Sequence, residues 1–188
     1  MCIRDRYDNK ECAGATLEQI PATLAKDVTY YAKWIPKEYK VTLYTNEGKI
    51  HSGNVASYTY GVVKTLPDDI SRTGCTFAGW YDNKSFKGTA VTEISDKTFG
   101  DVTYYAKWLP NTYHISYVTN DGKINEKYPM VYSYNTKTVL PTSVTKDGYT
   151  FAGWYDNADL AGERVESISV NDFGNKTYYA KWEKDTVD

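Results

Sequence analysis

Hydrophobic and polar residues alternate along several short stretches of this chain. From residue 39 the sequence reads Tyr-Lys-Val-Thr-Leu-Tyr, which places Tyr39, Val41 and Leu43 on one face of an extended backbone. A period of two residues, rich in β-branched and aromatic side chains, predicts a half-buried strand. The sequence Asn-Glu-Gly at 46–48 follows, and because these residues tolerate turns with positive φ, we expect a hairpin there.

Three more strands are expected before the pattern starts again. A second, less regular strand carries Tyr58 and Tyr60, a third covers 76–81, and a fourth covers 102–108. The fourth strand places every second side chain on one face, namely Tyr104, Ala106 and Trp108.

The segment between the third and fourth strands has a different spacing. Its large apolar residues, Val91, Ile94 and Phe99, lie near the spacing of a helical turn. This spacing favours a short helix or 3₁₀ segment that covers the sheet.

The whole pattern repeats with a fixed period. The sequence Thr-Tyr-Tyr-Ala-Lys-Trp ends at Trp34, Trp108 and Trp182, which are 74 residues apart (108 − 34 and 182 − 108). The block at 76–83 recurs at 150–157 with every residue unchanged. A constant period indicates a tandem array of one structural unit, so we predict full repeats at 39–108 and 113–182.

The remaining segments are interpreted by the same register. Residues 7–34 correspond to the C-terminal part of a truncated repeat, and 1–6 match nothing in the register, so we interpret them as a foreign leader. The segments 35–38 and 109–112 each contain proline and are predicted linkers. Residues 183–188 are expected to begin a further linker or a tail.

Tyrosine dominates the aromatic composition, with 19 Tyr and 5 Trp against 5 Phe. Small domains bury a modest fraction of their surface, so each repeat needs large rings to form a core. The predicted core therefore contains the repeated aromatic residues Phe77, Trp80, Tyr104 and Trp108, with Phe151, Trp154, Tyr178 and Trp182 in the second copy.

Charge and chemistry exclude several classes of function. The net charge is −2, which disfavours nucleic acid or an anionic membrane as the main partner. The three cysteines are not repeated, and no apolar run reaches the about 18 residues of a membrane span. The two histidines are not repeated either, since His51 aligns with Asn125 and His114 with Lys40. We therefore expect a monomer with no enzymatic activity and no cofactor.

Two repeated motifs have a binding interpretation and a structural one. Trp80-Tyr81 and Trp154-Tyr155 could stack on sugar rings, but adjacent strand residues face opposite sides, so tryptophan is expected in the core and Tyr81 and Tyr155 as the candidate ligand contacts. Asp-Asn at 82–83 and at 156–157 could supply oxygen ligands to Ca²⁺. Asx turns are the commoner use of such residues, and we predict no metal site.

The sequence Gly-Tyr-Thr-Phe-Ala-Gly-Trp-Tyr at 148–155, its variant with Cys75 at 74–81, and the closing Tyr-Tyr-Ala-Lys-Trp resemble the Listeria–Bacteroides repeat, also called the internalin B-repeat. The resemblance implies a β-rich α+β fold: small ubiquitin-like β-grasp units in tandem, each a four-stranded mixed sheet with at most a short helix. Cys75 departs from this pattern, because it replaces the usual aromatic residue.

The resemblance also implies a role in bacterial surface proteins, as in the stalks of adhesins. The function expected is a non-enzymatic spacer on an extracellular, cell-wall-associated protein, without membrane insertion in this segment. The alternative is a weak multivalent module that binds a host glycan or surface protein.

Overall fold

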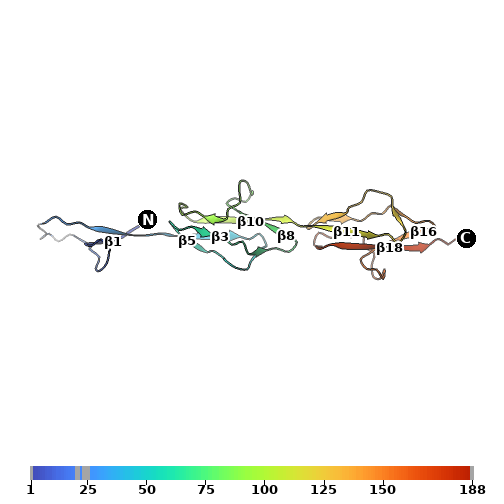
Figure 1. Cartoon of the computed structure of the whole chain (residues 1–188), viewed down its shortest axis with the longest axis horizontal. Coiled ribbons are helices and arrows are strands. Elements are labelled where there is room, and N and C mark those ends of the chain that lie inside the picture. The colour runs from blue at the N-terminus through green and yellow to red at the C-terminus, as the bar shows by residue number, and fades with distance from the viewer. Residues whose placement is uncertain (1, 20–21, 23–25, 187–188) are drawn as a thin grey trace. The chain divides into compact units, whose positions relative to one another are not determined.

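The computed structural model describes residues 2–19, 22 and 26–186, and none of these residues is helical. The chain divides into two compact units. The first comprises Met1–Ile70 and Ala78–Lys107, and the second comprises Ser71–Phe77 and Trp108–Asp188. Figure 1 follows the chain from its blue N-terminal end to its red C-terminal end.

Each full repeat contains one four-stranded mixed sheet. In the first repeat the strand order is β5 (Ser57–Thr59), β3 (Glu38–Tyr44), β10 (Val102–Pro110) and β8 (Cys75–Tyr81). In the second it is β13 (Val131–Ser133), β11 (Thr112–Val118), β18 (Lys176–Lys184) and β16 (Tyr149–Tyr155). The first and last strands of each repeat are parallel neighbours at the centre, and β5 and β13 run antiparallel to β3 and β11.

Short two-stranded pairs complete each repeat. In the first, β4 (Lys49–Ile50) pairs with β7 (Ile70–Ser71) and β6 (Lys64–Thr65) with β9 (Glu93–Ile94). In the second, β12 (Lys123–Ile124) pairs with β15 (Val144–Thr145) and β14 (Thr138–Val139) with β17 (Ser167–Ile168). At the N-terminus, β1 (Cys2–Tyr7) is antiparallel to β2 (Tyr31–Ile35), so residues 2–6 of the segment interpreted as foreign are part of a paired strand.

The turn after the first strand is confirmed, but the hairpin is not. Asn46 and Glu47 have φ of 50° and 69°, and the Gly48 N–H donates to the Thr45 carbonyl at 3.0 Å. The strand that follows the turn pairs with β7, whereas β3 takes β5 as its antiparallel partner. The turn therefore changes the direction of the chain without joining two neighbouring strands of the main sheet.

The helix expected between the third and fourth strands is absent from the described residues, and that prediction was wrong. Val91 forms a β-bridge to Trp80, and Ile94 lies in β9. Phe99 is 72% exposed, so it does not complete an apolar helical face. Val91 and Ile94 are held in extended chain by pairing with neighbouring strands, so the helical spacing of the apolar residues is coincidental.

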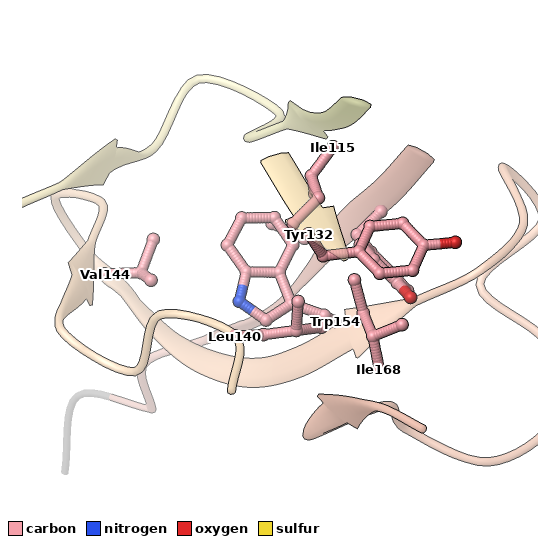
Figure 2. Packing of buried hydrophobic residues seen from close by; sticks show 8 residues of the cluster. Ile115, Tyr132, Leu140, Val144, Trp154 and Ile168 are labelled. Atoms are coloured by element: carbon pink, nitrogen blue, oxygen red, sulfur yellow. The ribbon is translucent and has the colours of Figure 1, made fainter. Parts of the chain in front are cut away.

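The core of each repeat is built around one tryptophan. Trp80 and Trp154 are each 2% exposed, and their indole N–H groups donate to the carbonyls of Pro67 and Pro141, both at 2.7 Å. Each ring is thus buried without losing its hydrogen bond. Figure 2 shows Trp154 among the other buried residues of its cluster, which include Ile115, Tyr132, Leu140, Val144 and Ile168.

The other residues expected in the core are buried to different degrees. Tyr104 and Tyr178 are 6% and 3% exposed. The remaining four are half-buried and line the rim of the core: Phe77, Trp108, Phe151 and Trp182. The Phe151 ring lies between the two tryptophans of its repeat, 5.4 Å from the ring centroids of Trp154 and Trp182.

Candidate functional site

The face of the sheet opposite the core is the first candidate binding surface. The alternation along β8 and β16 places Tyr81 and Tyr155 on this face, as expected. Their exposure does not follow the expectation, because each is only 8% exposed. The expectation that these two rings are exposed to a ligand is therefore wrong.

A folded loop and a lysine cover Tyr81. The Phe86 ring meets it edge to face at 5.7 Å between centroids, and the Lys107 ammonium lies 5.1 Å from its centroid. Lys181 lies in the same way over Tyr155, at 5.0 Å. Residues of the same repeat therefore cover each tyrosine ring, which gives the ring a structural role.

The loop is held closed by an asparagine, through bonds that span four residues instead of the two residues of an Asx turn. The Asn83 side chain donates to the Lys87 carbonyl at 2.9 Å and accepts the Lys87 N–H at 3.0 Å. Asn157 makes the same two bonds with Ala161, and Asn9 makes them with Ala13. The loop is therefore a local fold that occurs three times at the period of the repeat.

An aromatic pair, with one ring exposed and the other half-buried, lies across the neighbouring strands β3 and β10. Tyr44 is 52% exposed and stacks on Tyr105, with centroids 5.1 Å apart and ring planes 5° from parallel. The Lys84 ammonium lies 5.8 Å from the Tyr105 centroid. Two flat rings beside a cation form a surface suited to stacking on a sugar ring.

The sequence reasoning missed this pair because its two members come from distant strands. Tyr44 and Tyr105 become neighbours only through the parallel register of β3 and β10. The equivalent pair in the second repeat is Val118 and Tyr179, so the stacked pair is not repeated.

A groove of about 390 Å³ lies in the second repeat beside β16, a strand at the edge of its sheet. Phe151, Ala152 and Gly153 line one side, and Arg164 and Glu166 stand at its rim as an exposed ion pair with N–O distance 2.9 Å. The first repeat has Ala90 and Thr92 at the positions of the two charged residues. The charged pair at the rim of the groove is therefore specific to the second repeat.

Titratable groups do not gather into a reactive centre in the described part of the chain. No cluster of three or more His, Cys, Asp or Glu side chains there is placed to hold a metal ion. The groups with shifted pKa values are mostly buried tyrosines of the core. Burial, together with nearby Asp172, raises the pKa of Tyr178 to about 12, and burial also raises the pKa of Tyr117.

A hydrogen-bonded joint is formed by the predicted linker residue Asn111 within the second compact unit. Its N–H donates to the Gly74 carbonyl at 2.9 Å, and its side-chain oxygen accepts the Thr76 hydroxyl at 2.6 Å. Its carbonyl accepts the Tyr134 N–H at 2.9 Å. One residue thus satisfies groups on two segments, the turn at the start of β8 and the residue that follows β13.

Small sheets with aromatic cores, repeated along the chain every 74 residues, define a tandem-repeat protein. The family model of the Listeria–Bacteroides repeat domain matches residues 39–107 and 113–181. The chain belongs to this family.

The relatives are larger bacterial proteins. Over 160 residues, covering 85% of this chain and 18% of the relative, it is 32% identical to the "Putative Gly-rich membrane protein" of Evansella cellulosilytica. Over 176 residues, covering 89% of this chain and 31% of the relative, it is 31% identical to Internalin H of Listeria monocytogenes. The chain thus spans less than a third of the length of each of these relatives, and no solved structure matches it.

No helix among the described residues is long and apolar enough to span a membrane.

Proposed function

We propose that this chain is a non-enzymatic spacer segment of a larger bacterial surface protein, which holds a distal binding domain away from the cell wall. The single observation that carries the proposal is the use of the repeated residues. The tryptophan, tyrosine and asparagine of each repeat are engaged in core packing, ring stacking and loop closure. When the side chains shared by the repeats serve folding, the repeats are suited to a segment that sets the length of the protein.

The extracellular, cell-wall-associated location belongs to the same proposal. The relatives support it, since one is named as an internalin and another as a membrane protein. An adhesin stalk would need units that fold without a cofactor and carry little net charge, and this chain has a net charge of −2.

The fold proposed for each unit is a reduced β-grasp. Its support is the strand order, in which the first and last strands are parallel at the centre and the second and third lie at the edges. In this interpretation the segment across the sheet that a β-grasp fills with a helix is filled by extended chain around Ile168, which is fully buried.

The spacer proposal is tested by changing length and surface separately. We would display the chain on a Gram-positive cell with a peptide epitope at its outer end, and compare it with a deletion of 39–112, which removes one full period. Antibody-coated beads should capture cells with the full chain better than cells with the deletion. Tyr44→Ser should leave capture unchanged, and equal capture after deletion would reject the spacer function.

The second candidate function is weak, multivalent binding of a host glycan or surface protein. The Tyr44–Tyr105 stack with Lys84 favours it, because the Tyr44 ring is 52% exposed. Because the stack lies in one repeat, strong binding through it would depend on several copies of the chain.

A glycan array followed by surface plasmon resonance distinguishes the two functions. Under the spacer proposal, one-repeat and two-repeat chains bind no glycan tightly. Submicromolar binding lost in Tyr44→Ser, but kept in the control Phe173→Ser at another exposed ring, would favour the binding module.

A further inference from the structure

The residues 37, 111 and 185 occupy the same position of the period, since 111 − 37 and 185 − 111 both equal 74. The Lys37 carbonyl accepts the Tyr60 N–H at 2.9 Å, as the Asn111 carbonyl accepts that of Tyr134. Asp185 reproduces the other half of the Asn111 joint. Its N–H donates to the Gly148 carbonyl at 3.1 Å, and its carboxylate accepts the Thr150 hydroxyl at 2.8 Å.

The carbonyl that accepts the N–H of Asn111 or Asp185 belongs in each case to a glycine in a turn. Gly74 has a φ of +69° and Gly148 a φ of +72°. At Gly74 a Cβ atom would lie only 2.3 Å from Cδ2 of the Tyr134 ring, so the ring is seated directly on the glycine. At Gly148 a Cβ atom would meet nothing within 4 Å. The same backbone turn is thus covered by a tyrosine in one copy and open in the other.

We propose that the turn 146–149, together with Asp185, is a docking surface for a further copy of this repeat joined directly after Asp185. The tyrosine of that copy equivalent to Tyr134 would rest on Gly148, and its N–H would donate to the Asp185 carbonyl. The occupant is argued from the arrangement at Gly74 and Asn111, where each of these contacts is already made.

The chemistry of the open turn suits an aromatic occupant. Tyr149 is 37% exposed, and the Lys146 ammonium lies 4.7 Å from its ring centroid. A second tyrosine seated on Gly148 would pack against the glycine Cα without displacing a side chain, because a Cβ atom at Gly148 would meet nothing within 4 Å. Alanine at this position would block the seat in the way that it would at Gly74.

The test compares the natural chain with an extended chain in which residues 112–188 are added after Asp185. Hydrogen exchange is measured at the Tyr134 amide and at the same amide of the added copy. Gly74→Ala should speed exchange of the Tyr134 amide by about tenfold or more, because it removes the seat. Gly148→Ala should do the same to the added copy, and should leave the Tyr134 amide of the natural chain unchanged.

The two glycines have nearly equal φ, so each variant controls for the backbone strain of the other. If Gly148→Ala leaves the amide of the added copy unchanged while the strand amides of that copy stay protected, the docking surface does not exist. The natural chain could instead self-associate in a concentration-dependent way that Gly148→Ala abolishes. This result would overturn the proposal that the occupant is a further repeat of the same chain.

The inference rests on the proposed spacer function, since docking would fix the spacing of successive repeats. The two can fail separately. Exchange at the added copy tests docking alone, whereas bead capture tests the spacer.

Discussion

The individual tyrosines of this protein differ in how their hydroxyls are satisfied. The Tyr132 hydroxyl donates to the Gly174 carbonyl at 2.6 Å, and Tyr58 does the same with Gly100 at 2.7 Å. The hydroxyls of Tyr117 and Tyr39 are buried and have no hydrogen-bond partner among the described residues. A buried hydroxyl without a partner keeps its desolvation cost, so the same side chain stabilises one site and weakens another.

This contrast predicts opposite effects of one substitution. Tyr117→Phe should raise the free energy of unfolding by about 1 kcal/mol, because it removes an unpaired buried hydroxyl while keeping the ring contact with Trp154 at 5.0 Å. Tyr132→Phe should lower it by about 1–2 kcal/mol, because the Gly174 carbonyl loses its donor. Urea denaturation of both variants checks the pair, and destabilisation by Tyr117→Phe would show that its hydroxyl is bonded in solution.

At the scale of elements, the bulge in β16 determines which rings reach the core. The pairing with β18 shifts between Phe151 and Gly153, so Phe151 and Trp154 contact each other on the core side. Gly153 has a φ of +126°, a conformation available almost only to glycine. The repeated Gly-Trp-Tyr sequence therefore encodes a backbone irregularity as well as two aromatic rings.

Alanine at this bulge should be costly. Gly153→Ala should lower the free energy of unfolding by about 2–3 kcal/mol. Alanine is strained at this φ, and its Cβ would approach Cβ of Arg164 to 3.2 Å. Gly162→Ala is the matched control. It has a φ of +85° with nothing within 4 Å, and should cost about 1 kcal/mol. Equal losses in thermal or urea unfolding would mean that the bulge contributes no more than φ strain.

The sequence predicted the elements that depend on local chemistry. The turn at Asn46 and the buried face of β10 follow from side-chain periodicity and turn propensity, and both are present. The features that it missed depend on contacts between distant segments. The cover over Tyr81 requires the loop that brings Phe86 back, and the Tyr44–Tyr105 stack requires the parallel register of β3 and β10. The helix expected near Ile94 was overruled by strand pairing for the same reason.

At the scale of the whole molecule, stability depends on tyrosines that must stay protonated. Burial raises the pKa values of Tyr58, Tyr104 and Tyr132 from the ordinary 10.0, and that of Tyr178 to about 12. The folded state therefore holds these protons more tightly than the unfolded state does. Their contribution is complete below about pH 10 and is lost as the pH rises from about 10 towards about 12.

Urea denaturation at a series of pH values should show this loss as a fall in unfolding free energy above pH 10. Tyr178→Phe should make the fall shallower, because it removes one linked proton. A slope identical to that of the natural protein would show that Tyr178 titrates normally when folded.

Each repeat is also expected to fold independently. Residues 113–183 contain all of β13 and β16, nearly all of β11 and β18, and the buried cluster around Trp154. This fragment should give a single cooperative thermal transition and dispersed amide signals, whereas 7–34 alone should give neither. A disordered spectrum for 113–183 would reject the repeat boundaries.

The parallel pairing at the centre of each sheet has a mechanical consequence. In the first repeat the chain comes in along β3 and leaves along β10, and these strands run side by side in the same direction, with Val41 opposite Val102 and Tyr44 opposite Tyr105. A pull on the two ends of the chain drags the strands in opposite directions along their length. Every hydrogen bond between them is then loaded at once, in shear, and none can open before the others. A protein attached at one end and pulled at the other would resist through the pairing of these two strands. The force needed to unfold it would be set by the unfolding barrier and not by the equilibrium stability.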